Sequence, residues 1–218
     1  MGAAALRQQF DSFLGSPLDW RTRPLPETVP SGAPGIDLPR GSLTEIVGPA
    51  SSGRTSLLLS ILAAATARQE SCALVDAEDA FDPRSAASAG VCLARLLWVR
   101  CGHHAGHALQ AADLLIQGGG FGLAILDLGD TPPAVARRIS LTSWFRLRRA
   151  VENTPAVLVT VSQQSLAGTC ASLALQCARE QAAWSGAPAS RLLRHIRVRA
   201  TSTYRSRTCS PVFTATAL

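Results

Sequence analysis

Short apolar runs alternate with helical patterns along this chain, and this alternation constrains the fold more than any other feature. Five runs have the length and composition of buried strands: residues 42–48, 72–77, 96–101, 123–128 and 156–162. Five segments with helical patterns lie among them: residues 54–69, 84–90, 106–120, 131–139 and 141–153. Strands that are apolar along their whole length are typical of a parallel sheet covered by helices on both faces. The sequence therefore predicts an α/β fold with a mostly parallel sheet.

The two ends of the chain depart from this pattern. Residues 3–14 predict an amphipathic helix, and residues 16–41 are rich in proline and glycine and predict an extended connector. The apolar stripe of that helix consists of Leu6, Phe10, Phe13 and Leu14. Two further strands, over 170–178 and 191–203, are expected to extend the sheet as antiparallel neighbours. We therefore divide the chain into an N-terminal helix and connector, 1–26, and a core domain, 27–218.

Composition excludes several classes of protein. The chain of 218 residues is 47% hydrophobic and 17% charged, which is typical of a globular domain. It has no apolar run of about 18 residues and no basic segment ahead of an apolar one at its start, so neither a membrane span nor a secretory signal is expected. Six cysteines without a C-x-x-C pair favour a reducing cytoplasm. Net charge is +6, and every basic residue apart from histidine is an arginine.

The segment "GPASSGRTS", between the first strand and the first long helix, has nearly the spacing of the phosphate-binding motif G-x-x-x-x-G-K-[ST]. Such a loop directs backbone N–H groups and a helix N-terminus at phosphates. The candidate nucleotide-binding residues are Gly48, Pro49, Ala50, Ser51, Ser52, Gly53, Arg54, Thr55 and Ser56. Thr55 and Asp127, at the end of a buried strand, are the candidate Mg²⁺ ligands. Arg54 stands in the lysine position and keeps its charge but not its compact shape. The alternative is a glycine turn retained for packing after nucleotide binding was lost.

Two longer stretches, residues 27–59 and 72–83, resemble the core of the RecA recombinases, and the runs at 123–128 and 157–164 continue the match in order. The resemblance covers residues 27–165. It implies that ATP and Mg²⁺ are the cofactors, that Glu78 activates the attacking water, and that Gln163 senses the γ-phosphate. It also implies that Asp82 and Pro83 lie beside the adenine.

The departures from the RecA pattern point to a subgroup. Arg54 replaces the lysine, Ser85 replaces an adenine-stacking tyrosine, Ser162 replaces an asparagine, and only about half a dozen residues follow Gln163 before the next strand. This pattern is similar to the RecA-like accessory proteins of bacterial translesion mutasomes, the ImuA group. The resemblance implies a cytoplasmic role in DNA damage tolerance through contacts with mutasome polymerase proteins or with itself. An ATP-dependent, DNA-binding recombinase and a cell-division inhibitor on the same scaffold are the alternatives.

Two clusters of residues admit competing interpretations. The tail from residue 181 contains six arginines and neither Asp nor Glu, and Arg197 and Arg199 would lie on one side of their strand. They are candidate contacts for the phosphates of single-stranded DNA, although an acidic partner would suit them equally. His103 and His107 are spaced like metal ligands on a helix, but a surface turn is the simpler interpretation.

Overall fold

The computed structural model describes residues 28–187, 191–204 and 207–216, so the predicted N-terminal helix lies outside the described residues. The strands are β1 (Thr28–Pro30), β2 (Asp37–Pro39), β3 (Ser42–Val47), β4 (Cys72–Asp76), β5 (Leu96–Arg100), β6 (Leu123–Asp127), β7 (Val157–Ser162), β8 (Leu173–Ser185), β9 (Leu192–Tyr204), β10 (Arg207–Cys209) and β11 (Val212–Thr216). The helices are α2 (Arg54–Ala67), α3 (Pro83–Ser88), α4 (Ala105–Gly118), α5 (Pro133–Ala136) and α6 (Leu141–Val151), with short 3₁₀ turns at Leu93–Arg95 and Gly168–Cys170.

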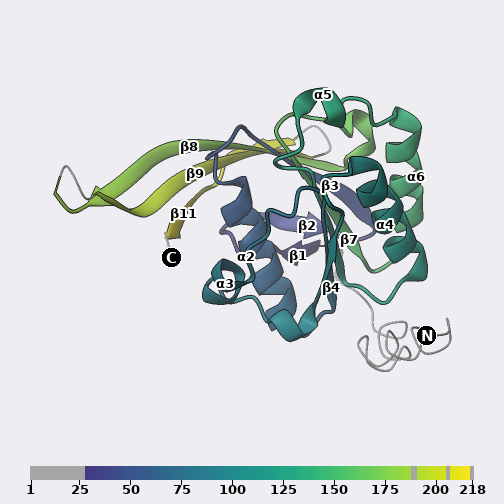
Figure 1. Cartoon of the computed structure of the whole chain (residues 1–218), viewed down its shortest axis with the longest axis horizontal. Coiled ribbons are helices and arrows are strands. Elements are labelled where there is room, and N and C mark those ends of the chain that lie inside the picture. The colour runs from purple at the N-terminus through teal and green to yellow at the C-terminus, as the bar shows by residue number, and fades with distance from the viewer. Residues whose placement is uncertain (1–27, 188–190, 205–206, 217–218) are drawn as a thin grey trace.

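One sheet of nine strands organises the described chain, in the order β10-β9-β8-β3-β7-β6-β4-β5, with β11 also paired to β9 (Figure 1). β3, β7, β6, β4 and β5 are all parallel to their neighbours. These are the five strands that the apolar runs predict, and the expected α/β fold with a mostly parallel sheet is confirmed.

Side chains alternate between two cores along the parallel strands. Ile46 and Leu74 join the core beneath α2 and α3, whereas Leu43 and Val75 join the core beneath α4 and α6. Figure 1 shows these helix pairs on opposite faces of the sheet. Both faces of these strands are therefore buried, which explains why their sequences are mostly apolar along their whole length.

The predicted antiparallel C-terminal strands are present, because β9 is antiparallel to β8, although β8 itself pairs parallel with β3. Two expectations about local structure are wrong. The extended connector contains a hairpin, β1 with β2, whose Val29 and Leu38 enter the core beneath α2. Nine residues, not about half a dozen, lie between Gln163 and β8, and they include a 3₁₀ turn. These segments lack a long periodic pattern, since each is short or only partly buried.

No helix among the described residues is long and apolar enough to span a membrane. Five cysteines of the described chain are free: Cys72, Cys92, Cys101, Cys170 and Cys177. Burial raises the pKa of both Cys72 and Cys177 to about 12, so these thiols behave as small apolar core groups.

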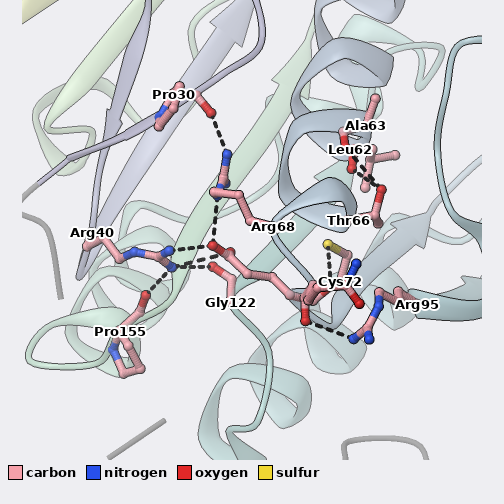
Figure 2. Close-up of polar contacts among 12 residues, drawn as sticks. Pro30, Arg40, Leu62, Ala63, Thr66, Arg68, Cys72, Arg95, Gly122 and Pro155 are labelled. Atoms are coloured by element: carbon pink, nitrogen blue, oxygen red, sulfur yellow. Dashed lines mark hydrogen bonds and ion pairs between the residues drawn. The ribbon is translucent and has the colours of Figure 1, made fainter. Parts of the chain in front are cut away.

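An ion-pair cluster joins the loops at the amino ends of the parallel strands (Figure 2). Glu70 accepts hydrogen bonds from Arg40 at 2.6 Å and from Arg68 at 2.9 Å. Arg40 also donates to the carbonyls of Gly122, at 3.3 Å, and Pro155, at 2.7 Å, which precede β6 and β7. The Arg40 and Glu70 side chains are only 10% and 16% exposed. The cluster therefore ties four loops together through one nearly buried carboxylate.

Replacing Glu70 by glutamine should lower the free energy of unfolding by about 3 kcal/mol, because two largely buried guanidinium groups would lose their charged partner. Glu152→Gln is the matched control, since its pair with Arg148 is exposed and lies within one helix, and should cost less than about 0.5 kcal/mol. Urea unfolding of both variants measures the difference. Equal midpoints would show that the cluster contributes nothing beyond an ordinary surface pair.

Candidate functional site

The candidate phosphate loop joins β3 to α2 at the carboxyl edge of the parallel strands, the edge at which ligands bind in such sheets. Ser51 and Gly53 have φ angles of 59° and 93°, and no side chain caps the N-terminus of α2. The first N–H groups of a helix have no partner within it, so α2 presents free donors here. The Ser52 hydroxyl is buried without a hydrogen-bond partner among the described residues. These groups fit a phosphate oxyanion.

Arg54 folds its side chain back into this loop. One terminal nitrogen donates to the Gly48 carbonyl at 2.5 Å, and the other lies 3.3 Å from a carboxylate oxygen of Asp130. Arg54 is only 5% exposed, so its charge is already balanced within the protein. Asp130 was not among the predicted site residues, because a lone acid in a loop carries no recognisable spacing.

Asp127 ends β6 beside the same guanidinium. It accepts a hydrogen bond from the Gly129 N–H at 2.8 Å. A β-carbon on Gly129 would lie 2.9 Å from this carboxylate and 3.4 Å from Nε of Arg54, so the backbone at this glycine separates the two charges. Burial raises the pKa of Asp127 to about 6; Asp76 and Asp130 add to the effect, and Arg54 opposes it.

The two candidate Mg²⁺ ligands have different surroundings. Thr55 is exposed at the start of α2 and its hydroxyl is accessible. Asp127 lies near a buried cation supplied by the protein itself, and that cation also pairs with Asp130. The residues present therefore fit the phosphate half of a nucleotide site better than the metal half.

Glu78 lies two residues beyond β4, which neighbours β6, as the sequence predicts. Its carboxylate accepts from the Thr131 hydroxyl at 2.8 Å and lies 2.9 Å from Nδ1 of His103. Both carboxylate oxygens of Glu78 therefore have a polar partner: His103 in the turn before α4 and Thr131 in the segment before α5. Its hydrogen bonds do not reach the phosphate loop, so a role in activating water remains a prediction.

Asp76, which was not among the predicted site residues, organises the turn that carries Glu78. Asp76 is buried and accepts hydrogen bonds from the N–H groups of Glu78, Ala80 and Phe81 and from Nε1 of Trp98. The phenyl ring of Phe81 packs edge-on against the Trp98 indole at 5.3 Å. The "VD" at the end of a buried strand was a usable signal for this residue.

The segment after β7 is held by a buried acid that was also missed. Glu45 on β3 is fully buried and accepts from the N–H groups of Leu166 and Ala167 and from the Ser165 hydroxyl, at 2.6–2.9 Å. Gln163, the predicted γ-phosphate sensor, is half-buried directly after β7. Its neighbour Gln164 accepts from Arg137 at 2.7 Å. This segment is therefore anchored to the sheet.

Asp82 caps α3, accepting from the N–H groups of Arg84 and Ser85 and from the Ser85 hydroxyl. The Ser85 hydroxyl is the main cause that lowers the pKa of Asp82, followed by the two backbone donors. Asp82 is exposed, and its role as the N-cap of α3 is sufficient to explain an aspartate at this position, with no need for a bound nucleotide. The predicted place of Asp82 and Pro83 beside an adenine thus remains a prediction.

The two C-terminal strands pack directly on the phosphate loop, a contact that the sequence analysis did not anticipate. A β-carbon on Gly53 would collide with the side chain of Val198 on β9. One on Gly48 would lie 2.7 Å from the carbonyl oxygen of Cys177 on β8. Both glycines are therefore required by the close approach of β8 and β9.

Arg197 and Arg199 lie on the exposed face of β9, whereas Val198 and Ala200 are buried, as the alternating pattern predicts. Arg199 donates to Glu180 on β8 at 2.7 Å, and no described acid pairs with Arg197. The two arginines are thus not equivalent, and a role in DNA binding stays a prediction for both.

The histidines do not form a metal site in the described part of the chain. His104 caps α4, and its ring stacks on that of His107 with 3.8 Å between centroids. His103 turns instead toward Glu78. No group of three or more described His, Cys, Asp or Glu residues is arranged to hold a metal.

Comparison with known proteins agrees with this architecture. Residues 27–134 match the family model of the RecA N-terminal domain. The chain carries a RecA-like domain. It is 32% identical to the RecA protein of Rickettsia bellii over 185 residues, which cover 74% of this chain and 54% of that protein. It is also 32% identical to the RecA proteins of Rhodopseudomonas palustris and Mesorhizobium japonicum over 158 residues, or 63% of this chain and 45% and 43% of theirs.

The chain spans about half the length of these curated relatives. The match includes β3, the phosphate loop, α2, β4 and β6, and with them Glu78 and Asp127. The comparisons thus relate this domain to the N-terminal domain of RecA proteins.

Asp127→Asn should raise stability at neutral pH. The raised pKa keeps the folded-state carboxyl protonated up to about pH 6, whereas the unfolded chain ionises near pH 4, so ionisation costs stability as the pH rises between these values. The variant keeps the acceptor for Gly129 and should be more stable by about 2–3 kcal/mol at pH 7, with no difference near pH 4. Denaturant unfolding at both pH values measures this, and exposed Asp37→Asn should show no such change. A pH-independent difference would mean that Asp127 ionises normally.

Proposed function

We propose that this chain is a RecA-like accessory protein of DNA damage tolerance that acts through protein contacts and does not turn over ATP. Two features support this proposal: the RecA-like domain, and a phosphate loop whose Arg54 is already paired within the protein. It assigns the chain to the ImuA-like accessory group, whose RecA-like member assists the polymerase proteins of a translesion mutasome. A cytoplasmic location belongs to the same proposal.

The observation that carries this proposal is the engagement of Arg54 by Gly48 and Asp130. A cation that stabilises transferring phosphate must turn toward the phosphate, and Arg54 would first have to give up both partners. Its planar guanidinium is also larger than the ammonium that the motif ordinarily supplies. Burial raises the pKa of Asp127 and so disfavours the carboxylate form that Mg²⁺ requires.

A specific observation also favours the second candidate, an ATP-dependent recombinase. The backbone of the loop retains uncapped donors at α2 and the unpartnered, buried Ser52 hydroxyl. These groups would still donate hydrogen bonds to the phosphates of ATP, and Thr55 would be available to Mg²⁺. Glu78 and Gln163 would have the roles that the resemblance implies. The two candidates therefore differ in the chemistry of Arg54 rather than in the shape of the loop.

The wild-type chain should bind ATP weakly and release phosphate at a negligible rate, with or without single-stranded DNA. Arg54→Lys should improve ATP affinity, because an ammonium is compact and can reach between phosphate oxygens. Asp130→Asn should improve it about threefold, since the loss of a charged but largely exposed partner, worth about 0.5–1 kcal/mol, frees Arg54 to turn to the nucleotide. Calorimetry and a phosphate-release assay measure both quantities.

Arg149→Lys on α6 is the control, because Arg149 is exposed and its substitution should leave ATP affinity unchanged. Robust phosphate release by the wild-type chain that increases with single-stranded DNA would overturn the accessory role and establish the recombinase. Failure of both loop variants to gain affinity would instead show that the loop is retained for packing alone.

DNA binding, as the second property proposed for the accessory role, should be independent of sequence and sensitive to salt. Replacing Arg197 and Arg199 together by glutamine should reduce the slope of log affinity against log salt by about 1–2, one unit for each lost phosphate contact. Arg197→Gln alone should account for most of the change, because Arg199 already pairs with Glu180. Titration of a fluorescent thymidine oligonucleotide at several salt concentrations provides the slopes, and an unchanged slope would place DNA elsewhere.

A further inference from the structure

β8 and β9 continue past the body of the domain as a projecting arm (Figure 1). We define the arm as residues 177–185 of β8 and 192–199 of β9. β3 pairs with β8 only as far as Gln176, and β11 covers the far side of β9 from His195 to Arg199. Within the described chain, the arm portion of β8 therefore has a strand neighbour on one side only. Its other edge offers backbone N–H and C=O groups for pairing with a further strand.

One face of the arm is mainly apolar and is interrupted by Arg179, which lies opposite Val198. Val198 is buried against the phosphate loop, and Ile196, opposite Ala182, is partly buried on the same side. The alternation along β8 carries this face outward to Trp184, which lies opposite Leu193. Trp184 is 55% exposed and Leu193 is 37% exposed. The apolar stripe thus begins in the core and ends uncovered.

The opposite face, here termed the basic face, carries Arg197 and Arg199, and at its outer end Leu192, which lies opposite Ser185 and is 65% exposed. Arg197 lies opposite Gln181, and His195 lies opposite Ala183, so all four share this face. Glu180 is the single acid among the described residues of the arm, and Arg199 already pairs with it. Arg197 is exposed and has no described acid beside it. The basic face therefore lacks the negative charge that would complement it.

The free edge is most regular from Gln181 to Ser185. One irregularity places Glu180 as an extra residue of β8, and the second, near Trp184, lies on β9 rather than on β8. A strand added along residues 181–185 would direct alternate side chains to the apolar face and to the basic face. Neighbouring strands lie about 4.8 Å apart, so Arg197, one strand farther, is within reach of an added glutamate.

These features discriminate among possible occupants. A second copy of this chain, paired edge to edge, would bring one basic face beside another, which is unfavourable. Nucleic acid would use the arginines and Trp184 but would leave Leu193 and the hydrogen-bonding edge without partners. A peptide that alternates acidic and apolar residues satisfies the edge and both faces at once.

We propose that the edge of β8 from Gln181 to Ser185 is a docking strand for an extended segment of a partner protein in which acidic and apolar residues alternate. The segment pairs with β8 through its backbone, covers Trp184 with its apolar side chains and neutralises Arg197 with its acids. This interaction specifies the protein contacts of the proposed function, and it is independent of whether the phosphate loop binds ATP.

The test uses the full chain and a short fluorescein-labelled peptide that alternates valine and glutamate, with binding followed by anisotropy. Trp184→Ser and Arg197→Glu should each weaken binding by about tenfold. The first removes the contact for the valines of the peptide, and the second removes the positive charge that binds its glutamates. Leu114→Ser on α4 and Arg149→Glu on α6 are the matched controls, since both residues are exposed far from β8 in the sequence and their substitution should leave the affinity unchanged.

Backbone pairing is tested with two further peptides, each N-methylated on alternate amides. Methylation of the amides that face β8 should abolish binding, whereas methylation of the other set should leave it intact. Equal effects of the two patterns, equal binding of a scrambled peptide, or no binding of the alternating peptide would overturn the proposal. So would tighter binding of a thymidine oligonucleotide that depends on the same residues, or a self-association that Trp184→Ser abolishes. None of these results changes the outcome of the ATP experiments, so the two proposals fail separately.

Discussion

The burial of β3 between β7 and β8 is the constraint on which the rest of this structure depends. All six residues of β3 are withdrawn from water, including the polar Thr44 and Glu45. The carboxylate of Glu45 has to find donors inside the protein, and it finds them in the segment after β7. The carboxyl end of the same strand leads directly into the phosphate loop. A single buried strand thus anchors both the loop that receives a ligand and the segment that follows β7.

The charge arrangement at the loop shows what an arginine does in the place of a lysine. An ammonium has one compact charge, whereas a guanidinium has several donors in a plane and can engage two acceptors at once. Arg54 does so with a backbone carbonyl and a carboxylate. The consequence is a site whose positive charge is already satisfied, beside an acid whose pKa is raised by burial. The loop thus keeps the backbone turn of a phosphate-binding site, but the positive charge of Arg54 is not free to bind a phosphate.

Periodicity and motif spacing predicted those parts of the molecule that local sequence determines. The five parallel strands, α2, α4 and α6 follow from apolar runs, and Asp127 at the end of a buried strand follows from the motif. Asp130 and Glu45 could not be assigned from spacing, because their partners are groups that only the tertiary fold brings near. Asp76 could have been found from its place at the end of a buried strand. β8 could not be oriented, since a partly buried strand pairs equally well in either direction until its neighbours are known. The predicted roles of Glu78 and Gln163 rest on resemblance.

The contact between Gly53 and Val198 has a consequence for related sequences. The two positions lie far apart in the chain but are in contact in the fold, so that a β-carbon at the first would collide with the side chain of the second. A larger residue at either position demands a smaller one, or a shift of β9, at the other. In homologues these two positions should therefore covary, and a chain that has lost the glycine should also have lost the branched side chain opposite it.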